Sequence, residues 1–176
     1  MKKLFTLALI ATGLMTLNAQ AQHDGDKSKR KSPPAEVSQK LKNGATVKIS
    51  YSQPSLNGRT IGKDVEPKTG QIWRTGANEA TIFETDKDLT IMGEKVPAGK
   101  YSLFTIYKDR IATVILNRKS DLWGTDGYDK KDDAATFDTK VITASSPSEK
   151  LTFNITPEGT VSLLWGNTQM NFSIQQ

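Results

Sequence analysis

Polar and apolar residues alternate with a period of two over most of this chain. Val47, Ile49 and Tyr51 are separated by single polar residues, a pattern typical of a strand with one buried face. Asn43-Gly44 lies between this segment and an earlier one with the same alternation that begins at Ala35. Because Asn-Gly is a strong hairpin signal, we predict a β-hairpin here.

Further short segments of the same kind follow, and turn-forming residues such as Pro97-Ala-Gly99 separate most of them. The additional predicted strands are residues 80–85, 89–92, 100–107, 111–117, 136–143, 150–156, 160–165 and 169–174. No segment has a sustained helical period, and residues 130–135 would form one turn at most. The pattern predicts an all-β fold, an antiparallel β-sandwich with little or no helix; jelly-roll and immunoglobulin-like topologies both remain open.

The strand predicted at residues 100–107 differs from the others because both of its faces are apolar. Leu103 and Tyr107 alternate with Phe104 and Ile106, and successive residues of a strand point to opposite faces. A strand that is apolar on both faces is buried on both. We therefore predict that it lies in the centre of the sheet.

Residues 1–21 have the pattern of a secretory signal peptide. Lys2 and Lys3 precede an apolar segment, and Ala19-Gln-Ala21 supplies the small residues of a cleavage site. The apolar segment is shorter than the about 20 residues that a spanning helix needs. We expect cleavage after Ala21 and export to the periplasm or the outside of the cell.

The rest of the chain divides into a flexible polar lead, predicted for residues 22–34, and a single β-sandwich domain, predicted for residues 35–176. The lead has no apolar residues except proline and holds a basic cluster at residues 27–31. The sequence contains no cysteine, so it offers no thiol for lipid attachment at the cleavage site. We therefore expect no membrane anchor after cleavage, and stability that rests on a hydrophobic core without disulfides.

Composition narrows the chemistry that this chain can perform. Its formal net charge of +5 includes the lysines of the signal segment and the basic residues of the lead. No basic cluster has interleaved aromatic residues. We therefore expect no nucleic-acid partner. His23 is the sole histidine and lies in the lead. Serine-histidine and cysteine-histidine catalysis and a tetrahedral zinc site are therefore not expected. Without a glycine-rich phosphate loop, we predict no cofactor.

Three motifs follow one another along the chain. They are Trp73-Arg-Thr-Gly-Ala-Asn-Glu-Ala-Thr81, Pro97-Ala-Gly-Lys-Tyr-Ser-Leu-Phe-Thr-Ile106, and a loop with Trp123-Gly124 and Tyr128-Asp129. This order resembles a family of exported bacterial proteins of unknown function, over roughly residues 35–174. The resemblance implies a β-fold and a location in the cell envelope or outside it. It implies no activity and no catalytic residues.

The motifs supply a candidate ligand-binding face. Its proposed residues are Trp73, Arg74, Asn78, Glu79, Trp123 and Tyr128. An aromatic ring beside polar and charged groups suits a sugar, because the ring packs on the sugar face while the polar groups bind hydroxyls. The first hypothesis is a non-enzymatic protein that binds a small molecule, a glycan or an envelope protein.

Two alternatives to this hypothesis remain open. The first is a carboxylate-dependent glycan hydrolase that uses Glu79, with Asp121 or Asp129 as the second acid. The second is purely structural: Trp73 plugs the end of the sandwich, and Arg74 pairs with Glu79.

Five aspartates lie within residues 121–133, and such oxygen-rich loops can bind calcium. Their spacing does not match an EF-hand, and the lysines at 130 and 131 neutralise part of the charge. We expect a hydrogen-bonded surface loop, with Asp126, Asp129 and Asp132 as calcium ligands in the alternative case.

Overall fold

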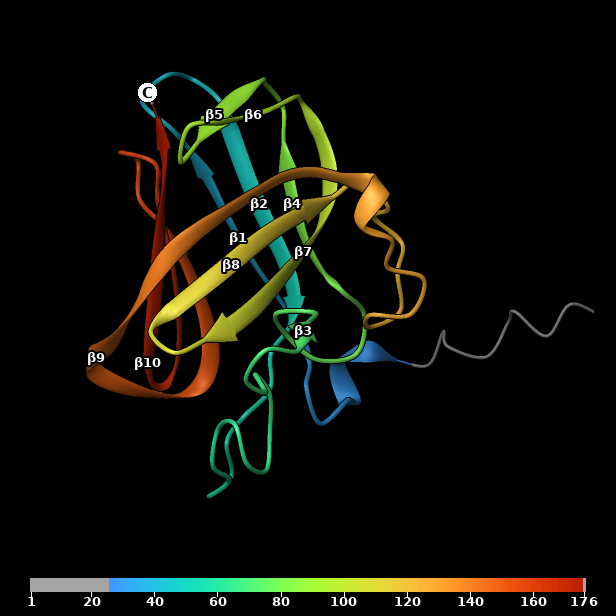
Figure 1. The fold of residues 1–176 in the computed structure, drawn as a ribbon, viewed down its shortest axis with the longest axis vertical. Helices are drawn as coiled ribbons and strands as arrows, with labels where there is room; N and C mark the ends of the chain where they lie inside the picture. Colours follow the sequence, from blue (N-terminus) through green and yellow to red (C-terminus); the bar gives the residue numbers. More distant parts are fainter. Residues whose placement is uncertain (1–25, 176) are drawn as a thin grey trace, which may run out of the picture.

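The computed structural model of the chain describes residues 26–175, and antiparallel strands make up most of them (Figure 1). The strands are β1 (Pro34–Lys40), β2 (Thr46–Ser52), β3 (Ile72–Trp73), β4 (Thr81–Thr85), β5 (Leu89–Ile91), β6 (Glu94–Val96), β7 (Gly99–Lys108), β8 (Ile111–Asn117), β9 (Asp133–Ile155) and β10 (Thr160–Gln175). Two 3₁₀ turns, η1 (Lys27–Lys29) and η2 (Lys130–Asp132), are the helical segments of this part of the chain. The all-β, antiparallel prediction is confirmed.

The strands follow the order β1-β2-β4-β7-β8-β9-β10-β5-β6, with every neighbouring pair antiparallel. Two-residue strand β3 lies off this path and pairs with β7 through Trp73 opposite Thr105. The predicted hairpin is present: β1 and β2 pair up to Lys40 and Thr46, and Leu41 N–H donates to Ala45 O in the loop. Among the described residues, no helix has the length and apolarity to span a membrane.

Strands β9 and β10 are longer than the sequence pattern predicts. Each unites two predicted strands, and their pairing shifts register on both sides of Gly166. Gly166 has a φ of 57°, and a Cβ there would lie 2.9 Å from Ile61 Cδ1. The residues around Gly166, which were predicted to end a strand, therefore form a β-bulge within β10. Glycine lies where the backbone needs a positive φ.

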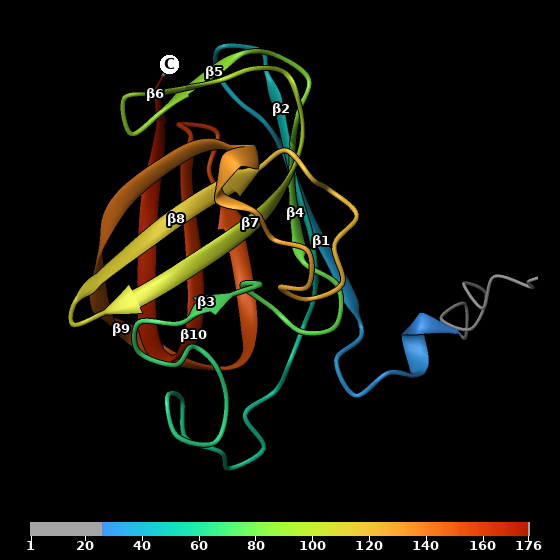
Figure 2. The same ribbon diagram turned by 45° about the vertical axis from the view of Figure 1, so that its right-hand side comes forward.

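The sheet curls, so that its two halves face each other across one hydrophobic core. Leu151 N–H donates to Pro54 O and Leu56 N–H donates to Glu149 O, which joins β9 to the segment that follows β2. Figure 2 shows β7 and β8 crossing in front of β9 and β10. The largest fully buried side chains between these layers include Ile49, Phe83, Leu103, Leu116, Leu163, Trp165 and Phe172.

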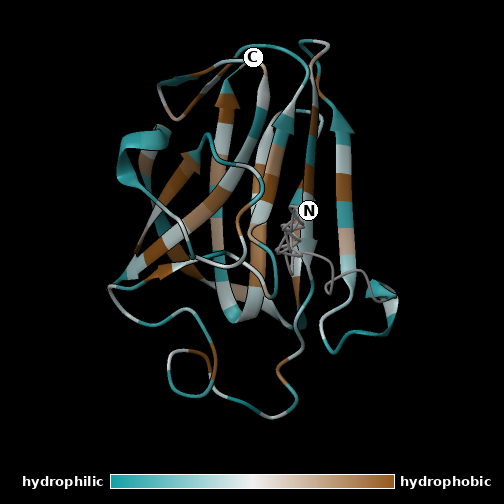
Figure 3. Ribbon diagram, turned by 90° about the vertical axis from the view of Figure 1, so that its right-hand side faces the viewer, coloured by the Kyte–Doolittle hydropathy of each residue, from teal (hydrophilic) through white to brown (hydrophobic). Residues whose placement is uncertain are grey.

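A second, smaller core lies on the outer face of β7 and β8. Phe104 and Ile115 are buried there with Ala80, and Leu122 and Tyr128 of the β8–β9 loop (residues 118–132) cover them. Leu103 of β7 faces the main core, so this strand is buried on both faces, as its sequence predicts. Apolar and polar bands alternate along the strands (Figure 3).

Candidate functional site

Trp73 is the last residue of β3 and is only 2% exposed. Its indole Nε1 donates a hydrogen bond to Gly76 O at 3.0 Å, and its ring is tilted against Tyr107 with 6.1 Å between centroids. This side chain belongs to the main core. Its burial is compatible with the structural alternative, although Trp73 also lines a cavity.

The loop that follows Trp73 has an unusual backbone conformation. Thr75 is buried and has a φ of 55°, which is rare for a β-branched residue. Its hydroxyl donates to Trp73 O, and its carbonyl accepts from Thr81 Oγ1 at 2.9 Å. A Cβ on Gly76 would lie 2.9 Å from Thr81 Oγ1 and 3.2 Å from Ser52 O. Thr75, Gly76 and Thr81, all residues of the first motif, thus fix the conformation of this loop.

Arg74 connects the first motif to the third. Its Nη1 donates to Asn78 O at 2.7 Å, and a Cβ on Gly124 would lie 2.8 Å from the same nitrogen. The guanidinium therefore lies directly against the backbone next to Trp123. A Cβ at this position would push the guanidinium away, and the φ of 65° at Gly124 independently favours glycine. The two motifs are separate in sequence but form one structural unit.

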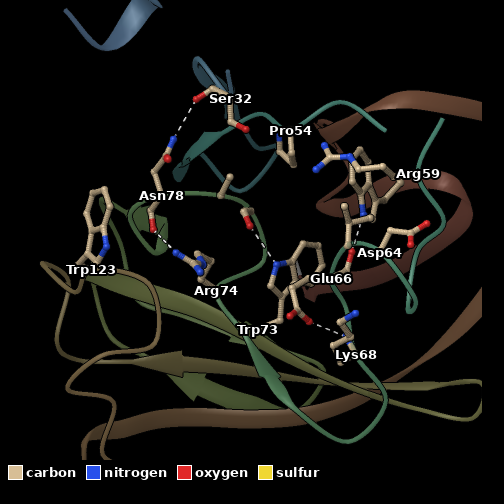
Figure 4. A pocket seen from close by; sticks show the side chains of 14 residues that line it. Ser32, Pro54, Arg59, Asp64, Glu66, Lys68, Trp73, Arg74, Asn78 and Trp123 are labelled. Carbon is tan, nitrogen blue, oxygen red and sulfur yellow. Dashed lines mark hydrogen bonds between the residues drawn. The ribbon is translucent and has the colours of Figure 1, made fainter. Parts of the chain in front are cut away.

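This unit lines a cavity of about 420 Å³, in which Arg74 lies between Trp123 and Trp73 (Figure 4). Trp73, Arg74, Asn78 and Trp123, four of the six predicted ligand-binding residues, line it. The other lining residues are Ser32, Pro54, Arg59, Asp64, Val65, Glu66, Lys68, Gly76, Ala77 and Trp165. We call this cavity the motif pocket. Trp123 is 40% exposed, so it is the aromatic residue whose surface a ligand can reach.

The β2–β3 connection forms a wall of the motif pocket that no sequence motif indicated. Arg59, Asp64, Glu66 and Lys68 come from this connection, and Trp165 Nε1 anchors it by donating to Glu66 O at 2.9 Å. A signal was present, because a connection longer than about 12–15 residues without regular structure is uncommon and often functional. The β2–β3 connection contains residues of both charges, without the alternation of a strand and without a recognisable motif.

Glu79 points away from the motif pocket and does not pair with Arg74. Both of its carboxylate oxygens accept from Arg30 Nη1 at 2.9 Å, and Lys27 Nζ lies 3.3 Å away. Asn78 Nδ2 also donates to Ser32 O at 3.1 Å. Asn78 and Glu79 therefore hold residues 26–33, which we call the N-terminal strap. This segment belongs to the lead, residues 22–34, that the sequence predicted to be flexible, and Pro34 at the end of the lead already begins β1.

The partners of Glu79 determine its ionisation. Burial alone would raise the pKa of Glu79, but hydrogen bonds from Arg30 and Lys27 and the charge of Arg30 outweigh burial and lower the pKa to about 2. Glu79 lines a separate cavity of about 280 Å³ together with Asp121. A general acid for glycoside hydrolysis needs a raised pKa. The carboxylate of Glu79 is instead ionised, and Arg30 and Lys27 compensate its negative charge.

The Glu79 pairing predicts a pH-dependent contribution to stability. Because the folded pKa lies below the ordinary value of about 4.3, the contribution is complete above that value and is lost as pH falls towards 2. The side chain is 37% exposed, so we expect Glu79→Gln to lower the free energy of unfolding at pH 7 by only about 1 kcal/mol. Urea unfolding of both proteins at pH 7 and pH 2 measures this difference. An equal difference at both pH values would contradict the assignment.

Tyr128, the last predicted ligand-binding residue, packs on the smaller core at the outer face of β7 and β8, which we call the outer core. Its ring packs edge-on against Phe104 with 5.2 Å between centroids, and its hydroxyl donates to Asp133 Oδ2 at 3.0 Å. Burial, followed by the hydrogen bond and charge of Asp133, raises the pKa of Tyr128 to about 12. The structure thus separates Tyr128 and Glu79 from the four residues that share the motif pocket.

Two of the three carboxylates proposed for calcium, those of Asp129 and Asp132, have other partners. Asp129 Oδ1 accepts from Lys131 N–H at the start of η2, and Asp132 Oδ2 lies 2.9 Å from Lys119 Nζ. Within residues 26–175, no three acidic or histidine side chains come together as a metal site. Asp129 and Asp132 thus take part in interactions within the loop, and calcium binding stays an untested alternative.

A family model described as "Protein of unknown function (DUF2911)" matches residues 32–174. The chain belongs to this family. The matched range begins at Ser32 in the N-terminal strap, so the DUF2911 domain includes all lining residues of the motif pocket. The resemblance to a domain family of unknown function is thereby confirmed, and export stays a prediction. Comparisons with curated proteins and with solved structures gave no match.

Proposed function

We propose that this DUF2911 protein binds a small polar ligand in the motif pocket and catalyses no reaction there. The observation that carries the proposal is the cavity of about 420 Å³ at the junction of the first and third motifs. Ligand sites are typically cavities of about 300–1,000 Å³ with an aromatic surface and a few placed polar groups. Exposed Trp123 and half-buried Arg74 supply both features.

A glycan is the ligand class that this lining favours. The indole of Trp123 offers a flat apolar surface for a sugar ring, and charged groups of the β2–β3 connection surround the cavity. None of these charged groups forms an ion pair with another among the described residues. Each of them forms hydrogen bonds within the chain, and the donors and acceptors that remain are available to sugar hydroxyls.

Binding is favoured over the hydrolase hypothesis by the position of Glu79. This carboxylate lies outside the motif pocket, and Arg30 and Lys27 keep it ionised near neutral pH. Hydrolysis at Glu79 would require the N-terminal strap to leave and a second acid to act with it. Asp121 lines the same smaller cavity, which is the one observation in favour of that hypothesis.

We further propose that the protein acts after export, in the periplasm or outside the cell, without a membrane anchor. The support is the charged, apolar and small-residue pattern of residues 1–21 and the absence of cysteine from the sequence. Residues 1–21 lie outside the described residues. An envelope glycan would then be within reach of the pocket.

Substitution of Trp123 tests the binding proposal. We expect the purified protein to bind at least one member of a panel of glucose, galactose, chitobiose, maltose and their acidic counterparts, measured by titration calorimetry. Trp123→Ala should weaken that binding by about tenfold, because it removes the stacking surface. Ile142→Ala, which removes another exposed apolar side chain, should leave it unchanged. No binding by the native protein, or equal effects of the two substitutions, would contradict the proposal.

A further inference from the structure

Within residues 26–175, Arg74 has no counter-ion. Among the described residues, no carboxylate forms an ion pair with its guanidinium, and its only hydrogen bond goes from Nη1 to Asn78 O. The side chain is half-buried and lines the motif pocket. A partly desolvated cation without an anionic partner is costly unless a ligand supplies the negative charge. The remaining donors of the guanidinium are in position to bind an anion.

The guanidinium is also held in one place before any ligand arrives. Nη1 is fixed by Asn78 O, and the backbone of Gly124 lies against the planar group. The carbonyl that fixes it belongs to a residue with a φ of 55°, in the loop secured by Thr75 and Thr81. A guanidinium fixed in this way loses little conformational entropy when it binds a planar anion through two hydrogen bonds.

The other cations of the motif pocket have fewer donors to offer. Arg59 Nε and Nη2 donate to Leu56 O and Ser55 O, and Lys68 Nζ donates to Lys63 O. The two acids of the lining accept from backbone N–H groups: Asp64 from Thr60 and Glu66 from Lys68. Arg74 is therefore the group best placed to receive the charge of a ligand.

The total charge of the lining favours a monoanion. Arg59, Lys68 and Arg74 carry three positive charges and Asp64 and Glu66 carry two negative ones, which leaves an excess of one positive charge. A carboxylate carries one negative charge, whereas a phosphate monoester carries nearly two at neutral pH. The cavity volume of about 420 Å³ suits a ligand of the size of a sugar acid.

We propose that the ligand of the motif pocket is an acidic saccharide whose carboxylate binds to Arg74 and whose ring packs on Trp123. This inference rests on the proposed function and narrows its ligand class. It assigns to the arginine of the first motif the role of recognising charge. The glycine of the third motif provides the space that this arginine needs.

Titration calorimetry with matched sugars tests the inference. Galactose is compared with galacturonate and glucose with glucuronate, and glucose 6-phosphate serves as a second anion. We expect the native protein to bind the sugar acid at least about tenfold more tightly than its neutral partner. Arg74→Gln should weaken sugar-acid binding by roughly 10- to 100-fold, the range for a lost charge-assisted hydrogen bond, and change neutral-sugar binding less than about twofold.

Two further variants make the result specific to Arg74. Arg74→Lys keeps the charge but loses the planar pair of donors, so we expect an intermediate affinity for the sugar acid. Arg110→Gln makes the same exchange at an exposed arginine in the β7–β8 turn, outside the motif pocket, and should leave binding unchanged. Melting curves of all variants show whether each is folded.

The possible results separate the inference from the proposed function. Equal affinities for acid and neutral sugars, with no effect of Arg74→Gln, would overturn the carboxylate assignment while the binding function stands. Tighter binding of glucose 6-phosphate than of glucuronate would overturn it as well. No binding of any sugar, neutral or acidic, would overturn the proposed function together with the inference.

Discussion

Replacement of Trp73 by alanine should lower the free energy of unfolding by about 3–5 kcal/mol. The side chain is only 2% exposed, lies in the main core, and packs against Tyr107. Removal of the indole leaves a large cavity. It also removes the hydrogen bond that the indole N–H donates to Gly76 O. Urea or thermal unfolding of the purified protein, followed by circular dichroism, measures the loss.

Trp123→Ala is the matched control, because it removes the same side chain from the other wall of the motif pocket. Trp123 is 40% exposed, so we expect a change within about 0.5 kcal/mol. Trp73→Phe, which keeps an aromatic ring but loses the N–H, should have an intermediate effect. Similar losses for Trp73→Ala and Trp123→Ala would show that the structure assigns the two tryptophans wrongly.

Strand positions could be predicted from this sequence because alternation is a local property. In β2, Val47, Ile49 and Tyr51 are buried and Thr46, Lys48 and Ser50 are more exposed, as the pattern indicates; Ser52 at the end of the strand is buried as well. The central position of β7 followed from its two apolar faces, filled by Leu103 and Phe104. Such patterns depend only on which residues face a core.

Continuity of strands was harder to predict. β3 consists of two residues, and its pairing with β7 depends on where the chain returns. Gly166 interrupts the alternation in β10, yet the ladder with β9 continues on both sides of it. A glycine within a strand pattern is compatible with both a turn and a bulge, and here the pairing with β9, which shifts register on both sides of Gly166, shows the bulge.

The composition of the candidate site was predictable only in part, because its contacts join distant segments. The motifs pointed to Trp73, Arg74, Asn78 and Trp123, and these residues do share one cavity. The contact of Arg74 with the third motif and the pairing of Glu79 with the N-terminal strap depend on topology. A charged residue carries no sequence signal that identifies its partner.

Phe104→Ala should cause a loss of stability as large as that of Trp73→Ala, about 3–5 kcal/mol. Phe104 is fully buried on the outer face of β7, where Tyr128 of the β8–β9 loop covers it. The substitution removes the centre of the smaller core, so it should also loosen the loop that carries Trp123 and Gly124. Hydrogen exchange should increase in residues 118–132, and ligand affinity should decrease because Arg74 loses the backbone against which it lies.

Tyr128→Phe provides the control for this substitution. It keeps the ring on Phe104 and removes only the hydrogen bond to Asp133, so we expect a loss of about 1 kcal/mol and little change in the exchange of the loop. If Phe104→Ala destabilises the protein but leaves residues 118–132 protected, the outer core does not hold the loop. The hydrogen bonds of Asn117 and Arg118 to Asp133 would then be its main support. Because the loop supplies one wall of the motif pocket, this experiment links the outer core directly to ligand binding.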